Sequence, residues 1–360
     1  MPDGYRAAVI GATGAVGGKV LQVLEERDFP LCELVPFASS RSEGNPIEFK
    51  GKTLACRTLR GDAVQDFDLA FMAAGGSVSR DWAPQFADGG ALVIDKTSYW
   101  RMDPEVPLVV PEINPEATTD ALFGRGIISS PNCSTMALVM ALYPLHREAT
   151  VEEVVVSTYQ SVSGTGNAAV RELEDQSHAL LHQAEPQPPA VYPHQIAFNV
   201  LPHVETFDAG DGYTTEERKM MGETRKILDL GDDQLHIVAT CARVPVIAGH
   251  SESVRIRTRE TLTLERAREL LSKAEGLVLV DDPASNCYPT AVEAADRDEV
   301  FVGRLRHDPG PDGGRYLNLW VVGDNLRKGA ATNAVQIAQL LHEQGLASAQ
   351  QRAAWQPAVA

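Results

Sequence analysis

The sequence predicts an α/β protein with two domains, and three observations support this prediction. Residues 5–27 combine a short apolar strand, a glycine-rich turn and an amphipathic helix. Further apolar runs, at 67–76 and 89–98, continue the alternation typical of a doubly wound parallel sheet. After residue 133, several β-rich runs are linked by helical segments, which indicates an α+β domain.

Composition excludes several classes of partner. With 360 residues and 44% hydrophobic content, the chain suits a globular protein of roughly two domains. The net charge of −17 argues against nucleic acids and anionic membrane surfaces, which are bound largely through basic patches. The longest apolar run, at 136–145, is shorter than the ~20 residues of a membrane span, and the opening has no targeting pattern. We expect a cytoplasmic protein with neither a nucleic-acid nor a membrane partner.

The five cysteines are odd in number and widely spaced, and no two form a C-x-x-C pair. This spacing suggests neither a disulfide framework nor a zinc site. Thiols in a reducing compartment are therefore expected, with no metal.

The glycine turn predicts a dinucleotide site. In "GATGAVG", Gly11, Gly14 and Gly17 permit a tight turn, close approach of the backbone to a pyrophosphate, and close packing of helix on strand. The G-x-x-G-x-x-G spacing departs from the commoner G-x-G-x-x-G, so a glycine turn without a ligand is the alternative. The predicted cofactor contacts in this turn are Gly11, Thr13, Gly14, Ala15, Val16 and Gly17.

The second strand, within 31–44, indicates which cofactor binds. Folds that bind NAD usually end this strand with an acidic residue for the ribose 2′-hydroxyl, and none stands here. Ser39, Arg41 and Ser42 instead offer a guanidinium and hydroxyls suited to a 2′-phosphate, which favours NADP. A solvated Arg-Ser turn is the alternative. Gly76 ends a later strand where the cofactor is expected to lie.

Cys133 is the candidate nucleophile. In "SSPNCST" (129–135) it follows a strand-like run and precedes the apolar "MALVMAL", so it is predicted at a helix N-terminus. There the helix dipole lowers a thiol pKa and backbone amides can hold an oxyanion. A cysteine chosen at random would more often be buried and inert, but this setting favours the reactive interpretation.

Several motifs together resemble one family, the aspartate-semialdehyde dehydrogenases, over nearly the whole chain. The matching stretches include "GATGAVG", "ASSRSEG", "SSPNCST", "YQSVSGTG", "TTEERKMMGETRKIL", "RVPVIAGHSES" and "GDNLRKGAATNAVQIA". The resemblance implies NADP-dependent, reversible reduction of L-aspartyl-4-phosphate to L-aspartate 4-semialdehyde, with release of phosphate. This step feeds lysine, threonine, methionine and diaminopimelate biosynthesis. It also implies a homodimer, which can pair into a tetramer.

The chemistry of this reaction agrees with Cys133 as the nucleophile. Attack of a Cys133 thiolate on an acyl phosphate would expel phosphate and leave a thioester that can accept hydride. By the resemblance, His250 is the acid/base, Gln160 orients the substrate carbonyl and Asn132 contributes donors near the oxyanion or phosphate. From the residues alone, His250 equally suits an ordinary loop histidine. Gln160 and Asn132 equally suit buried groups that satisfy the backbone.

The resemblance also implies which residues bind the charged groups of the substrate. Arg243 is expected to bind the substrate α-carboxylate through two parallel hydrogen bonds from its guanidinium. Arg101 and Lys219 are expected to bind the phosphate. Glu216, three residues before Lys219, would bind the α-ammonium, although this spacing more commonly means a surface pair. The resemblance also places three residues at the nicotinamide half of the cofactor: Ser163, Gly164 and Asn325.

Two other functions remain open. The related N-acetyl-glutamyl-phosphate reductases carry their cysteine in a Gly-Cys-Tyr-Pro-Thr context, and "NCYPT" at 286–290 resembles it. We interpret Cys287 as a decoy, because it lies late in the chain. A non-catalytic nucleotide-binding relative would be free to lose its catalytic residues, and here they are present.

The predicted architecture has two parts. Residues 1–130 form a Rossmann-type NADP-binding domain that is completed by a C-terminal helix at 325–345. Residues 131–324 form the α+β catalytic and dimerisation domain. The proline-rich stretch at 184–192 is expected to be a loop within that domain.

Overall fold

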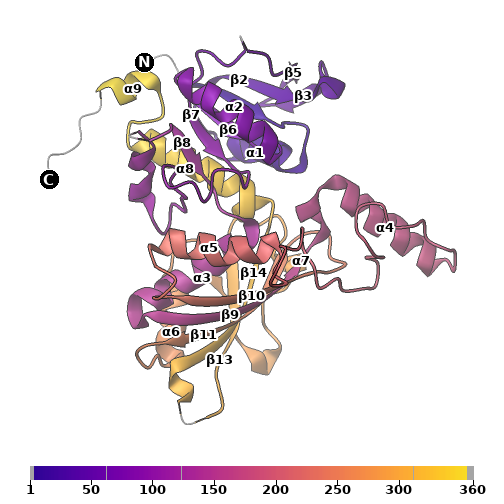
Figure 1. The fold of residues 1–360 in the computed structure, drawn as a ribbon, viewed down its shortest axis with the longest axis vertical. Helices are drawn as coiled ribbons and strands as arrows, with labels where there is room; N and C mark the ends of the chain where they lie inside the picture. Colours follow the sequence, from indigo (N-terminus) through magenta and orange to yellow (C-terminus); the bar gives the residue numbers. More distant parts are fainter. Residues whose placement is uncertain (1–3, 62, 123, 311, 355–360) are drawn as a thin grey trace. The chain divides into compact units, whose positions relative to one another are not determined.

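The computed structural model describes residues 4–61, 63–122, 124–310 and 312–354. The chain divides into two compact units (Figure 1). The first comprises the described residues up to Pro131 and those from Ala330 onward, and the second runs from Asn132 to Gly329.

The first unit is built on a parallel sheet of six strands in the order β5-β2-β1-β6-β7-β8. Its strands are β1 (Tyr5–Ile10), β2 (Leu31–Ala38), β5 (Arg57–Thr58), β6 (Leu69–Met72), β7 (Leu92–Asp95) and β8 (Ile127–Ser129). Every residue of β6 and β7 is buried, as expected for strands covered on both faces. A separate antiparallel pair joins β3 (Pro46–Phe49) to β4 (Lys52–Ala55).

Helices cover both faces of this sheet. Apolar side chains of α1 (Ala15–Glu26) and α8 (Asn333–Glu343) share one hydrophobic cluster with β1. Those of α2 (Gly76–Asp88) belong to a second cluster. A short α9 (Ala349–Ala354) follows. The predicted doubly wound Rossmann-type sheet is confirmed.

The second unit contains a mixed sheet of six strands in the order β10-β9-β11-β14-β13-β12. The strands are β9 (Val151–Gln160), β10 (His236–Arg243), β11 (His250–Thr258), β12 (Leu277–Leu279), β13 (Val300–His307) and β14 (Tyr316–Gly323). The neighbours β9 and β10 run parallel, so their carboxyl ends meet at one edge, where Gln160 is the register partner of Arg243. The predicted α+β domain is confirmed.

One face of this sheet is covered by three helices that form a layer, α3 (Cys133–Ala149), α5 (Thr215–Leu228) and α6 (Leu264–Lys273). Figure 1 shows α4 (Asn167–Leu181) reaching away from the sheet, and a short α7 (Ala291–Ala294) contacts β14. Burial alternates along the second half of β9, where Val154, Val156 and Thr158 are buried while Val155 and Tyr159 are exposed.

The chain returns to the first unit through a helical stretch within the predicted range of 325–345. A π-helical segment, Arg327–Thr332, leads directly into α8, which begins at Asn333. Asn325 itself belongs to the second unit, because its Oδ1 accepts hydrogen bonds from the Gly249 amide and the Ser161 hydroxyl, both at 3.0 Å. Among the helices of the described residues, none is long and apolar enough to cross a membrane.

Candidate active site

Cys133 is the first residue of α3. Asn132 caps this helix, its Oδ1 accepting hydrogen bonds from the amides of Ser134 (2.9 Å) and Thr135 (3.2 Å). The Cys133 side chain is half-buried. Gly329 packs so tightly here that an added Cβ would lie 2.9 Å from the Cys133 Cβ. The predicted thiol at a helix N-terminus is therefore present in the structure.

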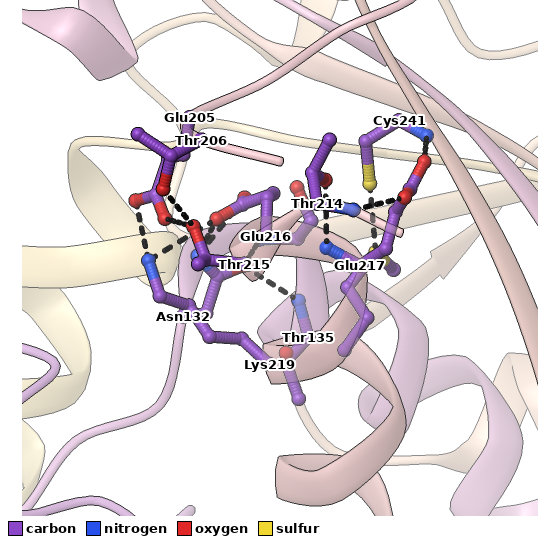
Figure 2. A network of polar contacts seen from close by, with 12 residues as sticks. Asn132, Thr135, Glu205, Thr206, Thr214, Thr215, Glu216, Glu217, Lys219 and Cys241 are labelled. Atoms are coloured by element: carbon purple, nitrogen blue, oxygen red, sulfur yellow. Dashed lines mark hydrogen bonds and ion pairs between the residues drawn. The ribbon is translucent and has the colours of Figure 1, made fainter. Parts of the chain in front are cut away.

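Helix α5 brings a carboxylate to the residue that caps α3 (Figure 2). Both oxygens of Glu216 accept hydrogen bonds from Asn132 Nδ2 at 3.0 Å. Gln160 Nε2 donates to Glu216 Oε1, also at 3.0 Å, and Lys219 Nζ lies 3.5 Å from Oε2. Lys219 also pairs with Glu205. Glu216 is only 3% exposed, so this is a buried network rather than a surface pair.

Two neighbouring strands end at this network. The Gln160 side chain also contacts Thr158 Oγ1, at 3.3 Å. The Arg243 side chain is 5% exposed, and its Nη1 donates to the Ser161 carbonyl at 2.7 Å. Its buried Nε has no hydrogen-bond partner among the described residues. Arg243 therefore holds a fixed orientation and keeps donor capacity for a ligand.

His250 begins β11 and is 1% exposed. Its Nδ1 lies 3.1 Å from both the backbone nitrogen and the hydroxyl of Ser161. Within the described part of the chain, its buried Nε2 has no partner. Burial lowers the pKa of His250 well below its ordinary value, and the nearby Arg243 cation lowers it further, while the Gly249 backbone acts in the opposite direction.

A cavity of about 290 Å³ joins most of these groups. Its walls include six of the predicted site residues, Asn132, Cys133, Gln160, Gly164, Glu216 and Arg243. The other lining residues escaped the sequence analysis, and three of them, Tyr192, His203 and Glu205, carry titratable side chains. Tyr192 is the last residue of the proline-rich stretch and donates to Thr165 Oγ1 at 3.0 Å. No local pattern distinguished these three residues from ordinary loop positions.

The residues assigned to the nicotinamide half of the cofactor form a compact polar group in the second unit. Asn325 Nδ2 donates to Ser163 Oγ at 2.9 Å. Gly164 lies against the Arg243 and His250 side chains, since an added Cβ would be 3.2 Å from Arg243 Nη1 and 3.3 Å from His250 Nε2. A side chain at position 164 would displace one of them.

The glycine turn of the first unit fits a dinucleotide. Gly11 has a φ of +86°, and a Cβ there would meet the Ala73 carbonyl oxygen at 2.7 Å. A Cβ on Gly17 would lie 2.1 Å from the Gly11 oxygen. Gly14 is the N-cap of α1, and no described side chain caps this helix. Thr13 lies in this turn, and Ala15 and Val16 begin α1, so the amides of a helix N-terminus stand where a pyrophosphate would bind.

The other predicted anion contacts also lie in the first unit. Ser39, Arg41 and Ser42 follow β2, where Ser40–Ser42 form a single 3-10 turn and the Arg41 side chain is exposed. Gly76 is the first residue of α2, directly after the loop from β6. Arg101 is 6% exposed, and its Nη2 donates to the Lys96 carbonyl at 2.8 Å.

Cys287 lies in a different setting from Cys133. It is exposed, and it closes a turn in which its amide and carbonyl bond to Asp282 at 2.9 and 3.0 Å. It precedes no helix N-terminus comparable to that of α3, and it is absent from the lining of the cavity that contains Cys133. This position supports the interpretation of Cys287 as a decoy.

Comparison with protein families defines the class. The model of the semialdehyde dehydrogenase NAD binding domain matches residues 6–121, and that of the semialdehyde dehydrogenase dimerisation domain matches residues 142–328. The fold is thus that of the semialdehyde dehydrogenases.

Individual relatives narrow this class. The aspartate-semialdehyde dehydrogenase of Aquifex aeolicus is 52% identical over 344 residues, which cover 95% of this chain and 99% of the relative. That of Bacillus subtilis is 44% identical over 354 residues, with 96% and 100% covered. The crystal structure of aspartate semialdehyde dehydrogenase II from Vibrio cholerae complexed with ASA has a TM-score of 0.90 and 43% identity, and covers 94% of this chain and 98% of that one. The chain belongs to the aspartate-semialdehyde dehydrogenase family, which confirms the resemblance seen in its motifs.

Proposed function

We propose that the protein catalyses the NADP-dependent, reversible reductive dephosphorylation of L-aspartyl-4-phosphate to L-aspartate 4-semialdehyde and phosphate, through a Cys133 thioester. The observation that carries this proposal is the cavity in which the Cys133 thiol, at a helix N-terminus, lies among Gln160, Glu216 and Arg243. Such a product would enter lysine, threonine, methionine and diaminopimelate synthesis, as in the family.

The thiol and its surroundings suit acyl transfer. The N-terminus of α3 stabilises the thiolate and offers amides to the oxyanion of the tetrahedral intermediate. Gln160 orients the substrate carbonyl, and Asn132 donates near the oxyanion or the leaving phosphate. Both amides are fixed by Glu216, so they are positioned before substrate arrives. His250 supplies the acid/base group of the site.

The two charged groups on the α-carbon of the substrate are each recognised by a side chain of opposite charge. The planar fork of Arg243 pairs with the α-carboxylate. Glu216 accepts the α-ammonium, in a position already surrounded by donors. Lys219 and Arg101 hold the phosphate. Since the chain carries a net charge of −17, such a local set of cations is needed to attract a dianionic group.

NADP is the proposed cofactor, and when bound it would supply or accept the hydride. The proposed contacts in the first unit are Gly11, Thr13, Gly14, Ala15, Val16, Gly17 and Gly76. Those in the second unit are Ser163, Gly164 and Asn325. Ser39, Arg41 and Ser42 would hold its 2′-phosphate. We expect Arg41→Ala to raise the KM for NADP about 10- to 100-fold through the lost charge-assisted bonds, with little change in the KM for NAD. Equal effects on both cofactors would contradict this assignment.

A homodimer is the proposed assembly, and pairing of dimers into a tetramer is the alternative. The matched dimerisation domain supports it, as does the sheet face opposite α3, where Val155 and Tyr159 are exposed and the Tyr159 ring lies beside that of Trp320, with centroids 5.4 Å apart. Light scattering should give twice the mass of one chain. Tyr159→Arg should lower this mass if the face is the interface.

The decisive test is phosphate-dependent reduction of NADP by the purified protein with L-aspartate 4-semialdehyde. Activity should require phosphate, exceed that with NAD, and disappear in Cys133→Ser. Cys287→Ser is the matched control and should retain activity. A wild-type protein that is inactive here yet turns over N-acetyl-glutamate 5-semialdehyde would establish the alternative reductase. Binding of NADPH without either activity would indicate a non-catalytic relative.

A further inference from the structure

Helix α4 reaches away from the sheet of the second unit (Figure 1), and two of its side chains hold the segment of chain that follows it. Glu172 Oε2 accepts hydrogen bonds from the backbone N–H groups of Ala190 and Val191, both at 2.7 Å. About one helical turn later, Gln176 Oε1 accepts from those of residues 196 and 197, at 3.0 and 3.2 Å. The same side of α4 therefore fixes the course of the returning segment at two points.

The returning segment depends on these anchors because it has no regular structure of its own. Residues 184–200 form neither a helix nor a strand, and the proline-rich stretch at 184–192 offers few backbone N–H groups, since proline has none. Glu172 receives three consecutive donors at its end, because Oε1 also lies 3.4 Å from the Tyr192 nitrogen. Hydrogen bonds to a carboxylate are roughly twice as strong as those between neutral groups. Glu172 is thus the main anchor of residues 190–192.

The anchored segment forms one wall of the candidate active-site cavity. Val191, Tyr192 and Pro193 all line this cavity. The Tyr192 side chain is half-buried and packs against an apolar cluster that includes Leu173 of α4. Its ring is therefore held by apolar contacts as well as by the anchored backbone, so the position of its hydroxyl is fixed before a ligand binds.

The Tyr192 hydroxyl lies near Arg243, which is the expected partner of the substrate α-carboxylate. It donates to Thr165 Oγ1 at 3.0 Å, and Thr165 follows Gly164, where an added Cβ would lie 3.2 Å from Arg243 Nη1. Burial raises the pKa of Tyr192, while the Thr165 hydrogen bond and the Arg243 cation act in the opposite direction, so the phenol keeps its proton at neutral pH. A threonine hydroxyl can also donate to the phenolic oxygen, which would release the phenolic proton to an anion.

The same end of the cavity has a second donor available to a ligand. Arg243 Nε is buried and has no hydrogen-bond partner among the described residues. A buried N–H without a partner is costly unless a ligand completes it. A carboxylate has two oxygens with about four lone-pair sites, so it can accept from the guanidinium and from the Tyr192 hydroxyl together.

We propose that Tyr192 determines specificity for the α-carboxylate of the substrate, to which its hydroxyl donates a hydrogen bond beside the Arg243 guanidinium. Glu172 is the positioning residue for the segment that carries the phenol. This inference rests on the proposed function and deepens it, because it adds a second group that recognises the α-carboxylate. An aldehyde that lacks this carboxylate gains nothing from Tyr192.

Two aldehydes separate this role from a general effect on folding or on the reaction. L-Aspartate 4-semialdehyde carries the α-carboxylate, and 3-aminopropanal is the same aldehyde without it. Both keep the amine and the reacting carbonyl, so a residue that acts on the carboxylate should affect only the first. Phosphate-dependent reduction of NADP gives kcat and KM for each aldehyde. Where turnover of 3-aminopropanal is too slow to follow, its inhibition constant against the first aldehyde takes the place of KM.

The first variant is Tyr192→Phe, which keeps the ring and removes the hydroxyl. It should raise the KM for L-aspartate 4-semialdehyde about 10-fold or more, as for loss of one hydrogen bond to a charged group, with kcat within about 3-fold of wild type. The value for 3-aminopropanal should stay unchanged. Equal effects on the two aldehydes, or no effect on either, would overturn the role of Tyr192.

The second variant, Glu172→Ala, tests the positioning role. It should reproduce the selective loss and speed the hydrogen exchange of the amides of 190–192, which lose their acceptor. Glu174→Ala removes an exposed carboxylate of the same helix and is the matched control, which should change neither quantity. Unchanged exchange in Glu172→Ala would overturn the positioning role.

Failure of the inference and failure of the proposed function give different results. A wild-type protein that is inactive on L-aspartate 4-semialdehyde would refute the proposed function, and the target of Tyr192 with it. An active protein in which Tyr192→Phe shows no contrast between the two aldehydes would refute only the role of Tyr192. The exchange measurement tests the anchor at Glu172 in either case.

Discussion

Helices α5 and α6 cover the same face of one sheet and carry acidic and basic residues at the same spacing, yet their charges do different things. In α6, Glu269 pairs with Arg266 and Lys273, each at 2.7 Å, and is 43% exposed. In α5, Glu216 lies 3.5 Å from Lys219 and is 3% exposed. The spacing of the residues is thus no guide to their role, and the packing around them is.

The difference arises from the groups that meet each carboxylate. Glu269 lies in water, where an ion pair contributes little because hydration already stabilises both charges. Glu216 has lost its water and receives hydrogen bonds from Asn132 and Gln160, two side chains outside its own helix. A buried carboxylate of this kind is stable only while its donors stay in place. Glu216 therefore fixes the two amides beside the nucleophile as well as offering a charge to the ligand.

The largest expected effect comes from neutralising Glu216. In Glu216→Gln, kcat/KM for L-aspartate 4-semialdehyde should fall roughly 10²-fold or more, as for loss of one partner of a buried charge pair. Glu269→Gln is the matched control on α6 and should leave kcat/KM unchanged. Steady-state kinetics on both variants measures the contrast. Comparable losses in the two would show that the helices are not functionally distinct.

The sequence predicted those features that depend on local pattern. The glycine spacing of 11–17 and the apolar strands gave the doubly wound sheet, since these patterns reflect constraints within a few residues. The helix after Cys133 could be predicted for the same reason, and Asn132 is a favoured N-cap residue.

Features that depend on tertiary packing could not be predicted in this way. The i,i+3 spacing of Glu216 and Lys219 fits a surface pair as well as a site, because it fixes only which side of the helix they share. Glu205 and Tyr192 line the cavity from loops that carry no periodic signal. The contact of His250 Nδ1 with the Ser161 backbone nitrogen, at 3.1 Å, also arises from packing, because every non-proline residue possesses such an N–H. The end of the second unit beyond 325 likewise follows from the hydrogen bonds of Asn325, and these are absent from the sequence pattern.

Glu252 provides a second contrast with Glu216, because it is equally buried but receives no hydrogen bonds from described residues. It is 0% exposed, and neither of its oxygens has a hydrogen-bond partner in the described part of the chain. Burial raises its pKa well above the ordinary 4.5, and the nearby Glu216 raises it further. Folded protein therefore keeps a proton on Glu252 that unfolded protein releases above pH 4.5.

The sign of the resulting pH dependence follows directly. A raised pKa in the folded state gives stability that is complete below pH 4.5 and is lost as the pH rises toward the folded value. Glu252→Gln has no such proton to lose, so its stability relative to wild type should increase by about 1.4 kcal/mol per pH unit in this window. Denaturant unfolding at pH 6 and pH 8 measures the difference. A difference in unfolding free energy between variant and wild type that stays constant or narrows from pH 6 to pH 8 would show that Glu252 is ionised in the folded protein.

The smallest effect is expected on α6, where the same charges remain hydrated. The cations of Lys273 and Arg266 lower the pKa of Glu269 to about 2, so their contribution is present above pH 4.5 and is lost progressively as the pH falls toward 2. We expect Glu269→Ala to lower the Tm slightly at low ionic strength and neutral pH. In 1 M NaCl the Debye length is about 3 Å, so most of this difference should disappear. A Tm difference that persists in high salt would mean that Glu269 stabilises α6 through packing, and the contrast with Glu216 would then no longer be one of hydration.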